Sequence, residues 1–185
     1  MPSVTEEQLV DIMSTFSNKM TAGDDQTPSF LIRDAKYILA KPLSILIYLA
    51  IRSSTCPDRW KRARITPVFK KGDSTNLKNY RPIAVLSNFA KLPEIVLYKN
   101  IFVDVQSHVS VFQHGIWPGR STVTNLCTLT QFSSEKLDNN GQVHVISTYF
   151  SNAFDSINHN ILLHKLSSFG FARSFLKLLE SYLTT

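Results

Sequence analysis

Residues 147–158, STYFSNAFDSIN, raise the question of a metal site. A β-prone run passes through Tyr149 and Phe150 and leaves one carboxylate, Asp155, next to Phe154. A carboxylate just after an apolar strand often holds a divalent ion, because magnesium prefers oxygen ligands. The residue best placed for that role here is a tyrosine. The stretch is therefore an active site, a damaged one, or no site.

A second candidate is the segment 59–81, in which Asp73 is the only acidic residue. Its cations are Arg59, Lys61, Arg62, Arg64, Lys70, Lys71, Lys78 and Arg81. In a strand–turn–strand, side chains near the turn converge on one face. Lys70, Lys71 and Arg81 would then hold a phosphate chain, the lysines as mobile point charges and the arginine as a fork. The alternative is a solvated basic hairpin without a ligand.

Other residue patterns offer little chemistry. Adjacent aspartates at a hairpin tip hold magnesium, but GDD at 23–25 lacks flanking apolar strands, so we expect a turn or a helix cap. The five histidines show no ligand spacing, and no glycine-rich nucleotide loop is present. Cys56 and Cys127 are the only cysteines, which excludes a disulfide framework and a cysteine-based zinc site.

The elements that must position these residues are helices with a few strands. A helix is expected at 4–20, where Thr5 and Gln8 are spaced as a capping box. Proline is expected to break the helical segment 30–53 near Pro42 and to end or kink an early turn of 88–104 at Pro93. The remaining expected elements are strands at 63–69, 81–87 and 142–150 and helices at 123–136, 159–171 and 173–183. Without regular alternation of strands and helices, this order predicts an α+β fold.

Composition limits the class of protein. The 185 residues suffice for one domain or part of a larger one, and 43% are hydrophobic, so a core is expected. The net charge of +6 is a mild polyanion signal. The N-terminus does not resemble a signal peptide, and the most apolar run, 43–51, is about half the length of a membrane span. We therefore expect a buried helix there and an intracellular protein of the cytoplasm or nucleus, not secreted, with no membrane or disulfide partner.

Three stretches in fixed order change this picture. They contain KKGD and NYRPI at 70–83, QHG-x-x-x-GRST-x-TNL at 113–126, and FS-x-AFDS-x-NH at 150–159. Together they closely resemble the reverse transcriptase domain of non-LTR (LINE-type) retrotransposons, in particular jockey-like elements. The resemblance covers nearly the whole chain from about Gly23, and residues 1–22 look like a linker with an N-terminal helix. It implies that 23–185 are the fingers and first part of the palm of a right-hand polymerase fold.

The resemblance also implies roles for single residues. Lys70 or Lys71 and Arg81 match residues that grip the triphosphate of the incoming deoxynucleotide. Phe154 matches the bulky residue that excludes a ribose 2′-hydroxyl, although without the resemblance a buried aromatic is the preferred interpretation. The loop that holds the backbones of the RNA template and DNA primer is matched by Gln113, Gly115, Gly119, Arg120 and Ser121.

Catalysis is where the chain departs from the family pattern. Position 149 is an aspartate in the family, and it binds both magnesium ions that clamp the 3′-hydroxyl and the phosphate. Tyrosine is uncharged at neutral pH and larger, so it does not replace this ligand. No adjacent aspartates follow residue 150. We therefore expect no intact catalytic residue and no bound magnesium, although the family uses Mg2+.

Three hypotheses remain open from the sequence. The first is a truncated, catalytically inactive fragment of an RNA-directed DNA polymerase. The second is a non-enzymatic RNA- or DNA-binding module that uses the cations of 59–71 with Arg81 and Arg120, and Trp117 for stacking on a base. The third is a fragment that does not fold alone, because the 142–150 strand would have an open apolar edge.

Overall fold

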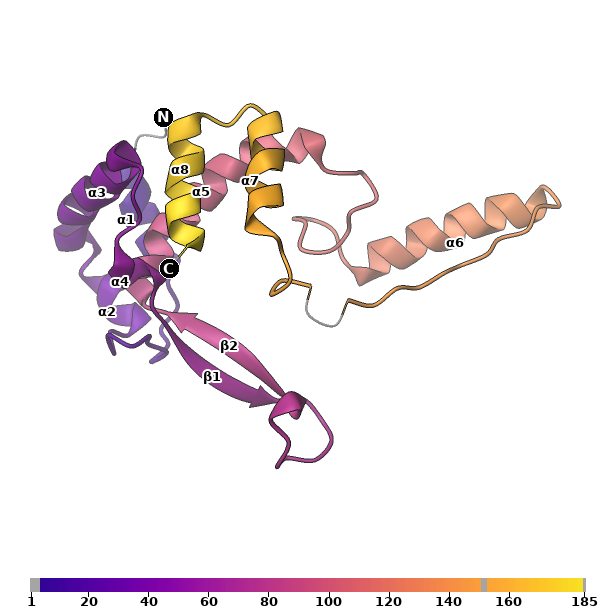
Figure 1. Ribbon diagram of the computed structural model, residues 1–185, viewed down its shortest axis with the longest axis horizontal. Coiled ribbons are helices and arrows are strands. Elements are labelled where there is room, and N and C mark those ends of the chain that lie inside the picture. The colour runs from indigo at the N-terminus through magenta and orange to yellow at the C-terminus, as the bar shows by residue number, and fades with distance from the viewer. Residues whose placement is uncertain (1–3, 151–152, 185) are drawn as a thin grey trace. The chain divides into compact units, whose positions relative to one another are not determined.

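The computed structural model describes residues 4–150 and 153–184, which form two compact units (Figure 1). The first unit contains the described residues up to Asp104 and those from His159 onward. The second unit is Val105–Asn158. Residues 1–3 of the expected N-terminal linker and residues 151–152 of the FSNAFDSINH stretch lie outside the described residues.

The first unit is a helical body. Its larger helices are α1 (Glu6–Ser14), α2 (Ser29–Asp34), α3 (Lys36–Ser53), α5 (Asn88–Val105), α7 (His159–Ser168) and α8 (Arg173–Leu183). A single turn, α4 (Asp58–Lys61), follows α3. The fully buried side chains Leu9, Met13, Ile32, Ile47 and Leu92 come from four of these helices and form the centre of the core.

Helix α1 begins where the sequence predicts and ends sooner. The capping box between Thr5 and Gln8 is formed, with the Thr5 hydroxyl accepting from the Gln8 amide at 3.2 Å. Leu9 and Met13 lie one helical turn apart and are both fully buried. The expected extension to residue 20 is wrong, because the hydroxyl of Thr15 donates to the Ile12 carbonyl at 2.7 Å and closes the last turn.

The predicted break near Pro42 is also wrong. Pro42 lies inside α3, and the chain bends instead at Ala35, between α2 and α3. A proline removes one backbone hydrogen bond and costs a helix interior about 3 kcal/mol. Buried side chains on α3, among them Ile47 and Ile51, each contribute about 1.5–3 kcal/mol, so packing outweighs this cost.

Pro93 likewise neither ends nor interrupts α5. It is buried inside the helix near Leu92 and Val96, which belong to the same core. The apolar run 43–51, expected to be buried, is buried on only one side of α3. Ile47, Ala50 and Ile51 are buried, whereas Ile45 and Leu49 are about half exposed, at 50% and 51%. No described helix is both long and apolar enough to span a bilayer.

A two-stranded antiparallel hairpin extends from the helical body of the first unit (Figure 1). Strand β1 (Ala63–Phe69) pairs with β2 (Tyr80–Leu86), with Ala63 opposite Leu86 and Phe69 opposite Tyr80. The first strand has the predicted bounds, and the second is shifted by one residue from 81–87. Helices with this single hairpin confirm the α+β class.

The second unit contains α6 (Thr122–Asp138), which starts at a capping box between Ser121 and Thr124. The strand predicted at 142–150 is wrong, because these residues form neither a strand nor a helix. A strand needs a neighbour for its backbone groups, and none of the described residues pairs with this segment. Its apolar side chains are therefore in solvent, with Ile146 88% exposed.

Candidate functional site

The alternation of side chains along β1 and β2 determines on which face of the hairpin each cation lies. Arg81 lies opposite Val68 in the register, and Arg64 lies opposite Val85. Successive side chains of a strand point to opposite faces, so Arg64 and Arg81 share one face. The ladder continues one residue past β1, where the Lys70 amide donates to the Asn79 carbonyl at 2.8 Å. By the same alternation, Lys70 belongs to the face of Arg81, and Lys71 comes after the paired residues.

The KKGD turn has an internal scaffold. The Asp73 carboxylate accepts from the amide and hydroxyl of Thr75, at 2.9 and 2.8 Å. These bonds hold the pKa of Asp73 below its usual value, the backbone bond contributing most. Gly72 has φ of +97°, a conformation that favours glycine. Asp73 is thus the brace of the turn, and the exposed side chains of Lys70, Lys71 and Arg81 are left facing solvent.

The base of the hairpin is anchored by residues that the sequence analysis missed. Asn88 is 2% exposed, and its amide group donates to the carbonyls of Thr21 and Thr27, at 2.9 and 2.8 Å. Arg64 donates to the Ala22 carbonyl at 3.0 Å. A Cβ on Gly23 would lie 2.6 Å from the backbone of Ser87. The only signal in the sequence is an asparagine at the start of a helix, which ordinarily indicates a cap.

These contacts also hold the GDD segment, residues 23–25, in place. Asp24 and Asp25 form a turn, as expected, and an Asp25 oxygen accepts from the Thr27 amide at 3.3 Å. The turn connects no strands. Its place in the fold is to seat the chain against the start of α5.

The loop 113–121 in the second unit is ordered by Arg120. The guanidinium donates to the carbonyls of Val111 and Gln113, both at 2.7 Å, and lies 5.5 Å from the centre of the Trp117 ring. Ser121 caps α6, and Gly119 has φ of +74° with open space around it. In this conformation the guanidinium of Arg120 therefore binds the loop itself.

Most of the other loop residues are exposed to solvent, whereas His114 and Trp117 are partly buried. The Gln113 amide donates to the Gly115 carbonyl at 3.0 Å, which closes a tight turn. From Gly115 to Gly119, Trp117 is partly buried and the other four residues are exposed.

The aromatic residues of the opening stretch are not in a core. Tyr149 is 89% exposed, and Phe150 and Phe154 are both 75% exposed. The alternative of a buried aromatic at Phe154 is therefore wrong in this structure. The nucleotide-binding residues expected from the sequence are divided between units, with Lys70, Lys71 and Arg81 in the first and Phe154 in the second.

The described residues form an α+β protein. Its hairpin exposes Lys70, Lys71 and Arg81, and its loop 113–121 is braced by Arg120. A sequence profile described as "Reverse transcriptase (RNA-dependent DNA polymerase)" matches residues 68–185. The chain belongs to this reverse transcriptase family, which confirms the resemblance seen in the motifs.

The relatives are proteins of mobile elements. The chain is 26% identical over 187 residues to "Probable RNA-directed DNA polymerase from transposon BS" of Drosophila melanogaster, with 96% of the chain and 20% of that protein covered. It is 24% identical to "RNA-directed DNA polymerase from mobile element jockey" of the same species, over 89% of the chain and 18% of the relative. It is 28% identical to a retrovirus-related Pol polyprotein from the R2 element of Popillia japonica, over 62% of the chain and 16% of the relative. The chain thus spans about a fifth of the length of the first two.

Enzymes of this family generally use Mg2+. Within residues 4–150 and 153–184, no three His, Cys, Asp or Glu side chains gather as metal ligands. At the position where the family resemblance implies a metal-binding aspartate, Tyr149 offers a phenol, a poorer ligand for a hard cation than a carboxylate. The donor chemistry at Tyr149 therefore does not fit magnesium.

Proposed function

We propose that this chain is the fingers and first part of the palm of a non-LTR retrotransposon reverse transcriptase. The single observation that carries the proposal is the placement of Lys70 and Arg81 on one face at the turn end of the β1–β2 hairpin, within a chain of this family. Their task is to bind the triphosphate of a deoxynucleotide. The loop 113–121 has the complementary task of holding the backbones of an RNA template and a DNA primer.

The chemistry of the hairpin follows from its charges. Arg81 presents a planar fork that bonds two phosphate oxygens at once, and Lys70 and Lys71 add mobile point charges. Asp73 braces the turn through Oδ1, which accepts both bonds from Thr75, and its carboxylate offsets one of the positive charges of this segment. The hairpin therefore binds and orients phosphate, and no bond is made or broken by its residues.

We also propose that this chain does not polymerise DNA. Transfer of a nucleotidyl group requires carboxylates that hold two metal ions against the attacking and leaving oxygens. Tyr149 stands at the place where the family pattern has the first of them. When the same tyrosine replaces the matching aspartate of the intact jockey polymerase, extension should stop; retained extension would show that Tyr149 is not at the metal-binding position.

The proposed reverse transcriptase domain begins at about Gly23, after an N-terminal linker and helix. Two observations bear on this boundary. Gly23 lies against Ser87, which supports a domain start near it. Helix α1, however, contributes Leu9 and Met13 to the same core as α3. A chain starting at Gly23 should therefore be less stable than the full chain.

A second candidate function is a non-enzymatic RNA- or DNA-binding module. The observation that favours it is the exposure of Lys70, Lys71 and Arg81 on the hairpin, together with the finding that among the described residues no three His, Cys, Asp or Glu side chains gather as metal ligands. Such a module would bind the nucleic acid backbone but show no preference for a nucleoside triphosphate.

One experiment separates the two candidates. The full chain is irradiated with 4-thio-dTTP in one set of samples and with a 4-thiouridine RNA in another. Three proteins are compared: the unchanged chain, the double variant Lys70→Ala/Arg81→Ala, and the control Lys41→Ala/Lys177→Ala, which removes two exposed cations from α3 and α8.

We expect the hairpin variant to lose at least tenfold in nucleotide labelling and the control to keep it. Labelling of RNA with no labelling by the nucleotide would support the binding module instead. Equal nucleotide labelling of all three proteins would refute the role of the hairpin.

A further inference from the structure

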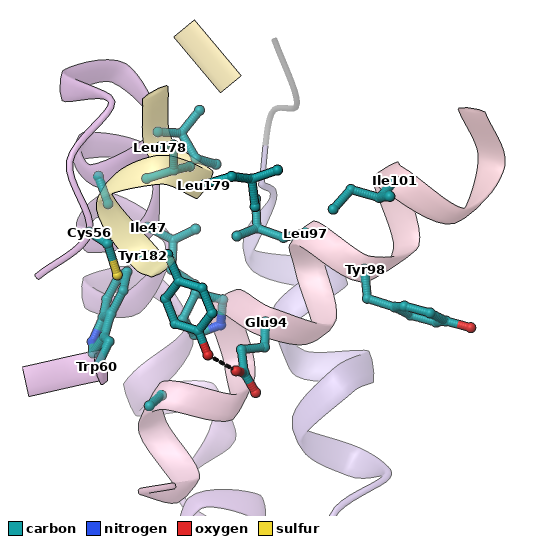
Figure 2. Close-up of a pocket in the computed structure, with 14 residues that line it drawn as sticks. Ile47, Cys56, Trp60, Glu94, Leu97, Tyr98, Ile101, Leu178, Leu179 and Tyr182 are labelled. Atoms are coloured by element: carbon teal, nitrogen blue, oxygen red, sulfur yellow. Dashed lines mark hydrogen bonds between the residues drawn. The ribbon is translucent and has the colours of Figure 1, made fainter. Parts of the chain in front are cut away.

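The first unit contains a cavity that the proposed polymerase function does not use. It has a volume of about 260 Å³ and lies between α3, α5 and α8, with the α4 turn beside it. The wall is almost entirely apolar, with Ile47, Leu97, Ile101, Leu178 and Leu179 among its side chains. Figure 2 shows Leu97, Ile101 and Leu179 converging on one side of the cavity, and Cys56 and Trp60 lying together on another.

One polar pair interrupts this wall. The Tyr182 hydroxyl donates to a carboxylate oxygen of Glu94, and the tyrosine points from α8 toward α5 (Figure 2). Burial, the hydrogen bond and the negative charge of Glu94 together raise the pKa of Tyr182, so the phenol stays a donor. A carboxylate has room for about four donors. Among the described residues, Tyr182 is the one found bonding to it, which leaves acceptor capacity beside the cavity.

Size and polarity together define an occupant. An apolar cavity of about 150 Å³ in another protein holds benzene, so this one accepts a molecule of about ten non-hydrogen atoms. The apolar wall disfavours a molecule with an unpaired charge, and the Glu94 carboxylate in the lining repels an anion. The free acceptor capacity of Glu94 favours a molecule with one donor. We propose that this cavity is a binding site for a small, flat, uncharged molecule with one N–H or O–H group, the class to which indole belongs.

The test uses the full chain labelled with 13C at isoleucine methyl groups. Indole is titrated while methyl spectra are recorded, and benzofuran, which has the same shape but no N–H, serves as the matched ligand. Ile47 and Ile101 report on the cavity, and Ile32, which is buried elsewhere in the core, is the control. We expect indole to shift Ile47, Ile51 and Ile101, which line the cavity, and to leave Ile32 unchanged, and we expect benzofuran to bind at least ten times more weakly.

Two variants sharpen the result. Glu94→Gln keeps an acceptor for Tyr182 but replaces the second oxygen by a donor, so indole should bind about ten times more weakly and benzofuran should be unaffected. Ala90→Leu fills the cavity from α5 and should abolish binding of both ligands. If Ala90→Leu does not fold, Ile101→Phe fills the cavity from a half-buried position and serves the same purpose.

Several outcomes would overturn the inference. These are an absence of shifts at the solubility limit of indole, shifts that include Ile32, or binding that survives both filling variants. Equal affinity for indole and benzofuran would overturn the role of Glu94. Shifts of Ile47 and Ile101 that depend on protein concentration without ligand would show that a second copy of the chain covers the cavity.

Discussion

In the second candidate function, where the hairpin cations contact the nucleic acid backbone, removal of these cations should change how salt weakens nucleic acid binding. The variant Lys70→Ala/Lys71→Ala/Arg81→Ala removes three exposed charges at the end of the hairpin. Each phosphate contact adds about 0.9 to the slope of log affinity against log salt for a duplex, so three contacts add about 2.7. Between about 50 and 200 mM salt, the unchanged chain should therefore lose about fortyfold more affinity than the variant.

The assay is fluorescence anisotropy of a labelled RNA template annealed to a DNA primer, at a series of salt concentrations. The control is Lys41→Ala/Lys99→Ala/Lys177→Ala, in which the three cations are exposed on α3, α5 and α8. Both variants lower the formal net charge from +6 to +3, so overall attraction falls equally. Only the hairpin variant should lower the slope by about 2.7.

The reasoning would be refuted by equal slopes for the two variants. That result would show that the duplex responds to net charge and not to the hairpin. A slope that falls only in the control would place the binding surface on the helical body of the first unit instead.

Four further results are expected. Asn88→Ala should lower the free energy of unfolding in urea by about 1–3 kcal/mol, because the partly buried hydrogen bonds to the Thr21 and Thr27 carbonyls are lost; a change below about 0.5 kcal/mol would contradict this. Arg120→Ala should speed hydrogen exchange of the loop 110–121 at least tenfold with α3 unaffected, since the Val111 and Gln113 carbonyls lose their shared donor, Nη1 of Arg120; unchanged protection would count against the brace. Tyr149→Asp in this chain should leave primer extension at background, because no adjacent aspartates follow residue 150, and extension above background would overturn that view. Burial raises the pKa of the Cys56 thiol, and nearby Lys61 opposes this effect. The thiol therefore loses its proton at a lower pH in the unfolded chain than in the folded chain. The free energy of unfolding should fall as pH rises above about 9.0, and this fall should shrink in Cys56→Ala.

Local sequence patterns determined much of the molecule. The capping box at Thr5 and the bounds of β1 each depend on residues within a few positions of one another. Such features are predictable because the interacting groups are neighbours in the chain. The motifs around Lys70, Arg81 and Arg120 likewise identified the family, since their order and spacing are properties of the sequence alone.

Tertiary structure decided what depends on distant partners. Pro42 and Pro93 lie inside helices because burial on neighbouring helices offsets the lost hydrogen bonds, and no local rule reports that burial. Residues 142–150 have the composition of a strand, but a strand forms only where another strand supplies hydrogen bonds, and none of the described residues does.

The anchoring of the hairpin and the cavity belong to this second class. Asn88 holds carbonyls 61 and 67 residues away in the sequence, and Tyr182 meets Glu94 across 88 residues. The sequence determines which donors, acceptors and apolar groups exist. Only the packed chain decides which of them meet, because hydrogen bonds and apolar contacts act over a few ångströms and depend on how the whole core closes.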